Sequence, residues 1–196
     1  VPEGTEKIST SLTGRYVGGV IGYLEKGVTA ENLCSGVLLD GESGMPLAES
    51  EAGRAGTVRE CSLVTGIQYV GGVIGEIERG AGTYTKLYNY AGLGVTYVSE
   101  EERAARKDTT TRIYQYFGGI TGRVYAGNGL TGCVNYAPVA VTFVKDGKPI
   151  EEDLYAYIDN YPANNYYWNL PRYIGGICGT NEGTVTDCYS LCGAYG

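Results

Sequence analysis

A seven-residue stretch, Tyr16-Val17-Gly18-Gly19-Val20-Ile21-Gly22, decides the fold of this chain because it recurs three times without gaps. The other copies read YVGGVIG at residues 69–75, YFGGITG at 116–122 and YIGGICG at 173–179. We call this stretch the Gly-Gly unit. The segments that connect the copies vary in length, whereas the unit does not. Internal repetition of this kind is typical of proteins that stack one structural unit on the next.

The Gly-Gly unit reads as a β-strand with apolar side chains on both faces. Glycines mark places where a side chain would collide with a neighbouring backbone. Such a strand suits a sheet covered on both sides or a tightly wound coil. The residue after the glycine pair is never polar, so we expect four side chains to lie in the deeper core: Val20, Val73, Ile120 and Ile177. The next position varies from Ile21 to Thr121 and Cys178, which indicates a more tolerant face.

Composition agrees with a single all-β repeat domain over residues 1–196. The chain is 43% hydrophobic and contains 32 Gly and 19 Tyr, a composition that favours strands and tight turns. Its net charge of −7 and the lack of a basic stripe argue against a nucleic-acid partner. No apolar run is long enough to cross a bilayer. Because the sequence stops soon after Cys188 without a polar cap, we expect the natural protein to continue.

A second, shorter unit with a cysteine near its end accompanies the Gly-Gly unit. It covers Gly27-Val28-Thr29 leading to Cys34, Gly56 to Cys61, Gly132 to Asn135 and Gly183 to Tyr189. Copy two also has Leu87-Tyr88-Asn89 where a Cys-Tyr step is expected. Repetition of strand, turn and strand is the resulting pattern.

Residues 173–193 read YIGGICGTNEGTVTDCYSLCG, and this pattern resembles the GLUG-motif repeats of bacterial surface proteins. The resemblance implies a repeat β-solenoid, similar to a parallel β-helix, with irregular inserts. It also implies an extracellular or cell-surface location, sometimes as a non-catalytic part of adhesins or immunoglobulin A peptidases. Stacking physics favours the same shape, because a repeat that cannot bury its own apolar face must stack on its neighbour.

The chain has no histidine, which removes Ser-His-Asp and Cys-His catalysis and every metal site that needs imidazole. Glycoside hydrolysis needs only two carboxylates, so Glu151, Glu152 and Asp153 and the run Glu100, Glu101 and Glu102 are candidates. Their surroundings argue against this role. The first group follows Lys145-Asp146-Gly147-Lys148, a hairpin signature, and residues 100–107 alternate in charge as a solvated helix does. We therefore predict a non-enzyme without a cofactor or metal.

Two further motifs have structural interpretations. Residues 127–132 satisfy the G-x-G-x-x-G string of dinucleotide-binding proteins, but a strand-like segment follows, so we interpret them as a turn inside the repeat. The six cysteines contain no CxxC pair, which argues against zinc. Cys34, Cys61, Cys133 and Cys188 occupy the same place in the second unit, and this favours reduced core thiols over disulfides. If a disulfide forms, we expect it between cysteines of adjacent copies.

The insert between copies three and four is the predicted binding surface. Aromatic faces beside Asn side chains can stack on a sugar ring and hydrogen-bond its hydroxyls. The candidate ligand-binding residues are Tyr155, Tyr157, Tyr161, Asn164, Tyr166, Tyr167 and Trp168. The alternative is that these rings pack over the edge of the repeats.

Three functions follow from these patterns. The leading one is a non-catalytic structural or adhesive repeat module of a bacterial cell-surface or secreted protein, whose partner is a host or cell-surface protein or a glycan. The second is a carbohydrate-binding module that uses the insert over residues 154–169. The third is a β-helical enzyme that acts on polysaccharides.

Overall fold

The computed structural model describes residues 15–36, 63–80, 82–96, 114–137, 139–145, 148–150, 172–191 and 194–195. These residues form short β-strands and no helix, as the all-β prediction requires. The described residues therefore include no helix that could cross a membrane. The predicted ligand-binding residues 155–168 and the candidate carboxylates at 100–102 and 151–153 lie outside the described residues.

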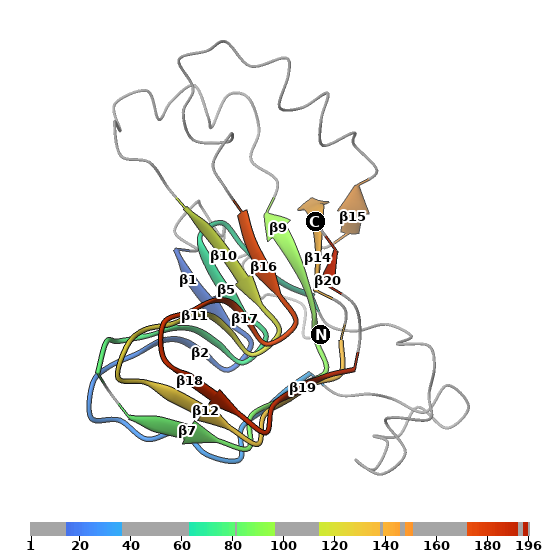
Figure 1. Cartoon of the computed structure of the whole chain (residues 1–196). Coiled ribbons are helices and arrows are strands. Elements are labelled where there is room, and N and C mark those ends of the chain that lie inside the picture. Colours follow the sequence, from blue (N-terminus) through green and yellow to red (C-terminus); the bar gives the residue numbers. More distant parts are fainter. Residues whose placement is uncertain are drawn as a thin grey trace, which may run out of the picture.

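Four sheets are built from strands that belong to successive repeats (Figure 1). Sheet A contains β1 (Tyr16–Gly18), β5 (Tyr69–Gly71), β10 (Gln115–Gly118) and β16 (Arg172–Gly175). Sheet B contains β2 (Ile21–Leu24), β6 (Ile74–Ile77), β11 (Thr121–Val124) and β17 (Cys178–Asn181). Sheet C contains β7 (Thr83–Thr85), β12 (Gly129–Thr131) and β18 (Thr184–Thr186). Sheet D contains β3 (Cys34–Ser35), β8 (Tyr88–Asn89), β13 (Val134–Asn135) and β19 (Tyr189–Ser190).

A fifth sheet forms from the strands that lie between the repeats. It contains β4 (Leu63–Gly66), β9 (Gly92–Thr96), β14 (Val139–Lys145), β15 (Lys148–Ile150) and β20 (Ala194–Tyr195). Only β14 and β15 pair antiparallel among the described strands, with Lys145 opposite Lys148. This pairing confirms the hairpin predicted around residues 145–148.

The strands of sheets A to D pair in parallel, and they follow one another in chain order. We number the repeats accordingly: β1–β3 form repeat 1, β5–β8 repeat 2, β10–β13 repeat 3 and β16–β19 repeat 4. The four tyrosines of the Gly-Gly units are aligned, since Tyr69 pairs with both Tyr16 and Tyr116, and Tyr116 pairs with Tyr173. The chain is thus all-β with parallel sheets, which is consistent with a β-helix-like fold.

Sheets A and B meet backbone against backbone at the glycines of the Gly-Gly unit. A Cβ atom on Gly122 would lie 2.8 Å from the carbonyl oxygen of Gly75 and 3.0 Å from that of Tyr116. A Cβ on Gly119 would overlap the side-chain amide of Asn135. Because carbon atoms pack best at about 3.5–4.0 Å, only glycine fits at these positions. The glycines therefore let the two sheets approach one another.

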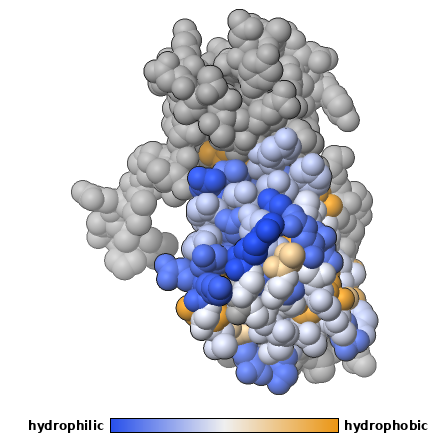
Figure 2. Space-filling view, turned by 60° about the vertical axis from the view of Figure 1, so that its left-hand side comes forward, coloured by the Kyte–Doolittle hydropathy of each residue, from blue (hydrophilic) through white to orange (hydrophobic). Residues whose placement is uncertain are grey.

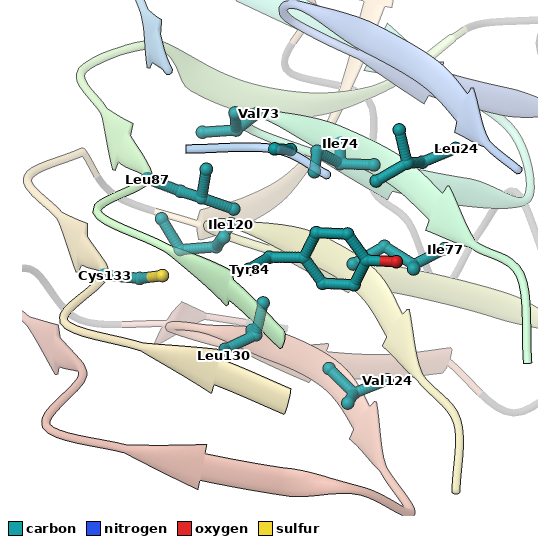
Figure 3. Close-up of a cluster of buried hydrophobic side chains, with 11 residues drawn as sticks. Leu24, Val73, Ile74, Ile77, Tyr84, Leu87, Ile120, Val124, Leu130 and Cys133 are labelled. Atoms are coloured by element: carbon teal, nitrogen blue, oxygen red, sulfur yellow. The ribbon is translucent and has the colours of Figure 1, made fainter. Parts of the chain in front are cut away.

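Two apolar cores lie on either side of this glycine contact. The larger one lies between sheets B, C and D and includes Ile74, Ile77, Tyr84, Leu87 and Ile120, none of which is more than 1% exposed (Figure 3). The smaller one joins sheet A to the fifth sheet through Val64, Val70, Ala91, Leu93, Phe117 and Val139. Burying a side chain such as Ile or Leu stabilises a protein by about 1.5–3 kcal/mol. The cores therefore hold the repeats together, while the glycines set the spacing of the sheets.

The prediction that the Gly-Gly unit is one continuous strand is wrong. Strand β5 ends at Gly71, the chain bends at Gly72 and Val73, and β6 begins at Ile74. Val73 and Ile74 are therefore both fully buried in the larger core, instead of facing opposite ways.

The predicted depth of the residue after the glycine pair holds in the middle repeats and fails at the ends. Val73 and Ile120 are fully buried, whereas Val20 is 44% exposed and Ile177 is partly buried. Repeats 1 and 4 each have a neighbour on one side only among the described strands. Burial at this position thus depends on a repeat both above and below.

The cysteine alignment is confirmed in part and corrected in part. Cys133 and Cys188 are stacked in adjacent repeats, and the backbone N–H of Cys133 lies 3.4 Å from Sγ of Cys188. Cys34 pairs instead with Tyr88, which is one residue later in the repeat, and it is exposed. The wrong alignment arose because Leu33 takes the buried place and the short unit of repeat 1 is shifted by one residue. Cys61 lies outside the described residues.

Gly122→Ala should lower the free energy of unfolding by about 3 kcal/mol or more, because its Cβ would press against fixed backbone atoms of two other strands. Urea denaturation followed by circular dichroism measures the change. Gly129→Ala in the same repeat is the control, since its Cβ would meet first the Thr83 side chain at 3.2 Å. That variant should differ from the wild type by about 1 kcal/mol or less. Equal losses in the two variants would contradict the close approach of sheets A and B.

Candidate functional site: a tyrosine ladder and a charged column

The first feature of the site is a ladder of tyrosine rings that runs across the four strands of sheet A. Tyr16, Tyr69, Tyr116 and Tyr173 stack in that order, with ring centroids 5.3, 5.0 and 5.2 Å apart and interplanar angles of 21°, 15° and 13°. Offset stacking at this separation contributes about 0.5–1.5 kcal/mol per pair beyond the area that is buried. The parallel in-register pairing of sheet A produces the ladder directly, because the same residue begins every Gly-Gly unit.

A column of unlike side chains runs beside the ladder on sheet B. Tyr23, Glu76, Arg123 and Thr180 occupy one register position in successive repeats. Glu76 is only 4% exposed, and the Oη of Tyr125 donates a 2.5 Å hydrogen bond to its Oε1. The column contacts the tyrosine ladder: the rings of Tyr23 and Tyr16 lie 5.1 Å apart, and the guanidinium of Arg123 lies over the ring of Tyr116.

Burial dominates the electrostatics of Glu76. Desolvation raises the pKa of this carboxyl above its usual value, although the hydrogen bond from Tyr125 and the charges of Arg123 and Arg15 act in the opposite direction. The pKa of the Tyr125 hydroxyl is raised as well, first by burial and then by the carboxylate it touches. This tyrosine thus stays protonated and remains the donor to Glu76.

Arg123 links the buried carboxylate region to the surface. Its guanidinium lies 4.2 Å from the centroid of the Tyr125 ring and 5.2 Å from that of Tyr116, and both separations are typical of cation–π contacts. It also forms an ion pair with Glu182, which Arg79 contacts at 3.4 Å. The side chains of Arg79 and Glu182 are 67% and 38% exposed, so this end of the network is in contact with solvent.

The described surface on one side of the molecule is mainly polar. Figure 2 brings the left-hand side of Figure 1 forward, and hydrophilic residues form a band across the described part of that face. Ion pairs at such exposed positions contribute little to stability, usually about 0–1 kcal/mol.

A second ladder, made of polar side chains, lies in sheet D, and its two central members, Asn89 and Asn135, are fully buried. The Nδ2 of Asn89 donates a 2.8 Å hydrogen bond to Oδ1 of Asn135 and another of 2.8 Å to the carbonyl oxygen of Ala91. The backbone N–H of Ala91 donates to Oδ1 of Asn89 at 3.0 Å. Ser35 and Ser190 take this position in the terminal repeats. Because its polar atoms are used within the ladder, we interpret this feature as structural.

The thiols of Cys133, which is buried, and Cys178, which is half-buried, are in their unreactive, protonated form. Burial raises the pKa of the Cys133 thiol to about 12 and that of Cys178 to about 11, so both stay protonated at neutral pH. Both residues belong to the larger core or pack against it. Among the described residues, no group of three or more Cys, Asp or Glu side chains is arranged to hold a metal ion.

The side chains of the ladder and of the column are largely in contact with one another. Most ring faces in the tyrosine ladder are covered by the next ring, so they do not offer a flat platform to a sugar. Glu76 accepts a hydrogen bond from Tyr125, and the charged side chains that act on it are the cations Arg123 and Arg15. The G-x-G-x-x-G string lies inside repeat 3, as we predicted, but only its first residue, Gly127, belongs to a turn. Gly129–Thr131 form strand β12, and the chain bends at Gly132.

Sequence reasoning missed the column and the Asn ladder. Glu76 and Arg123 are charged residues that directly follow the last glycine of the Gly-Gly unit, Gly75 and Gly122, and this shared position was the available signal. Asn89 and Asn135 follow Tyr88 and Val134 at the same place in two repeats, so an alignment of that step would have paired them.

Comparisons with known proteins give no assignment: no protein-family model, no curated protein and no solved structure matches this chain. The resemblance to GLUG-motif repeats therefore stays a prediction.

Glu76→Gln should make stability less dependent on pH. Because burial raises the folded-state pKa of Glu76, its favourable contribution is complete below the unfolded pKa and is lost as pH rises through the folded pKa. The variant should therefore have a higher melting temperature than the wild type at neutral pH, and the two should converge in acid. Gln keeps an oxygen that accepts the hydrogen bond from Tyr125. Thermal unfolding followed by circular dichroism across this pH range measures the difference.

Glu182→Gln is the matched control, since its carboxylate is paired with Arg123 and its pKa is lowered. It should be less stable than the wild type at neutral pH and should approach it as pH falls through that pKa. A Glu76→Gln variant that shows this same pattern would contradict the dominance of burial at Glu76.

Proposed function

We propose that the chain is a non-catalytic structural or adhesive module of a bacterial cell-surface or secreted protein, built as a β-solenoid of GLUG-type repeats. The observation that carries the proposal is the pairing of like residues through successive repeats, above all in the tyrosine ladder. Such a stack provides a rigid, extended support, because each repeat contacts mainly its neighbours.

The connections between repeats support a role in display. Strands β9 and β14 are neighbours in the fifth sheet, and β10 and β16 are neighbours in sheet A. Residues 97–113 connect β9 to β10, and residues 151–171 connect the β14–β15 hairpin to β16. The two connections therefore start from neighbouring strands, β9 and the β14–β15 hairpin, and end at neighbouring strands, β10 and β16. Binding residues are often carried on loops that a rigid scaffold positions, so we infer that the segment over residues 151–171, which contains the aromatic insert, carries the adhesive surface.

A carbohydrate-binding module that uses residues 154–169 is the second candidate. The hairpin of β14 and β15 favours it, because the hairpin and β16 fix both ends of this insert on the sheets. A host-protein partner and a glycan partner use the same display geometry and differ only in what the insert recognises.

Replacing residues 151–171 with a Gly-Ser linker of equal length should leave the melting temperature within a few degrees of the wild type and abolish attachment of chain-coated beads to a mucin-coated surface. The scaffold keeps its ladders and cores in this variant, since none of their described members lies in the replaced segment. A glycan array then separates the two candidates. Loss of array binding in Tyr166→Ala and Trp168→Ala variants that remain folded supports the carbohydrate module.

The same replacement in residues 97–113 serves as the matched control for insertion of a linker. Unfolding of the 151–171 variant would show that the insert packs on the repeats. Unchanged bead attachment would contradict the proposed adhesive surface.

A further inference from the structure

Burial is uneven along the stack of repeats. Strands β5, β6 and β10 in repeats 2 and 3 are buried throughout, whereas β17 is mostly half-buried and β19 is exposed. Six large hydrophobic side chains in repeats 1 and 4 are exposed: Val20, Tyr23, Val28, Tyr173, Tyr189 and Leu191. These exposed apolar side chains make the two end repeats the places to look for an interaction surface.

A hollow of about 430 Å³ opens at repeat 1. Its walls come from β1, β3 and β4, each of which is the end strand of its sheet. Val17, Val64 and Ala91 line it with apolar groups, and Ser35 and Gly36 form another part of its wall. Val64 and Ala91 also belong to the smaller core, and Val17 packs against it. The smaller core is thus open to solvent at this end of the stack.

Repeat 4 presents a side chain at the register position that corresponds to the hollow. The alignment of Ser35, Asn89, Asn135 and Ser190 places Gly36, Tyr90, Tyr136 and Leu191 at one position in successive repeats. Tyr90 and Tyr136 stack there, with ring centroids 4.5 Å apart. Gly36 has no side chain to continue this stack, while Leu191 is 58% exposed. The repeat 1 end of the stack therefore carries a hollow, and the repeat 4 end carries the projecting side chain of Leu191.

We propose that two copies of this chain associate head to tail, with repeat 4 of one copy seated on repeat 1 of the next. The interface continues the three repeat–repeat interfaces inside the chain, so Tyr173 stacks on Tyr16 of the next copy and Leu191 enters the hollow beside Gly36. The proposal rests on the stacked repeats of the proposed function. Because the two surfaces differ, the association is heterologous and open, and it produces linear assemblies.

The sheet edges favour the same partner. In the described sheets, β1 and β2 pair on one side with repeat 2, and β16 and β17 pair on one side with repeat 3. An edge strand of this kind is a template for a further strand. A second copy supplies strands with the same parallel direction and the same Tyr-x-Gly-Gly pattern, which a chance partner does not.

Light scattering after size exclusion tests the association with the full 196-residue chain. The weight-average mass of the wild type should rise with concentration above the 20.9 kDa chain mass. Val20→Asp blocks the repeat 1 end and Leu191→Asp blocks the repeat 4 end, so each variant alone should elute at 20.9 kDa. Thr83→Asp, at an exposed position on the side of repeat 2, is the control and should assemble like the wild type.

Mixing the two blocked variants gives the sharpest result. Val20→Asp keeps a free repeat 4 and Leu191→Asp keeps a free repeat 1, so the mixture should form a dimer of one copy of each and stop there. Assembly of Leu191→Asp alone would show a symmetric contact between like ends and overturn the proposal, and so would a wild type that stays at the chain mass at millimolar concentration. Bead attachment by folded, monomeric Leu191→Asp is measured in parallel. Attachment by this monomeric variant would show that adhesion does not need assembly. If the wild type attaches although it stays at the chain mass, the adhesive function stands and this inference alone is wrong.

Discussion

The close approach of two backbones at the Gly-Gly unit is the constraint on which the rest of this structure depends. Sheets A and B touch where Gly75, Gly122 and their counterparts leave no room for a Cβ atom. The bend at the glycine pair places one apolar residue in the smaller core and the next two in the larger core, as Val70, Val73 and Ile74 show. A single short motif thus sets the spacing of the sheets and divides the apolar side chains between two cores.

Parallel, in-register pairing converts sequence repetition into ladders. When the repeated residue is an aromatic ring or an amide, the neighbours above and below satisfy it: Tyr69 stacks on two rings, and Asn89 donates to Asn135. Where the repeats differ, the column holds unlike groups, and Tyr125 contacts two of them: its hydroxyl donates a hydrogen bond to Glu76, and its ring lies against the guanidinium of Arg123. The middle repeats are well buried because each has a repeat on both sides, whereas repeats 1 and 4 each have one neighbour among the described strands and keep apolar surface exposed.

Much of the architecture could be predicted from the repeated Gly-Gly unit, because parallel stacking needs only that equivalent residues recur. The all-β class, the burial of Val73 and Ile120 and the hairpin after Lys145 followed from local patterns. The bend at Gly72 could not be predicted from a two-residue period, which assumes an unbroken strand. The shifted position of Cys34 was missed because Leu33 and Cys34 are both acceptable core residues, and only the pairing with Tyr88 distinguishes them.

The site was harder to predict than the fold. The contact between Glu76 and Tyr125 joins residues 49 positions apart, and it depends on how the turns of adjacent repeats align. The aromatic insert stood out in the sequence through its composition, but its residues Tyr155 to Trp168 lie outside the described part of the chain. Composition therefore identified a candidate surface, whereas the described structure supports a scaffold that holds both ends of that surface.

Nuclear Overhauser contacts between tyrosine rings test the central claim most directly, because a chain of 20.9 kDa with selectively labelled Tyr is suited to solution NMR. Stacked repeats predict ring-to-ring contacts from Tyr16 to Tyr69, from Tyr69 to Tyr116 and from Tyr116 to Tyr173, and none from Tyr16 to Tyr116. Contacts that skip a repeat, or the absence of any contact between these rings, would contradict parallel stacking of the Gly-Gly units.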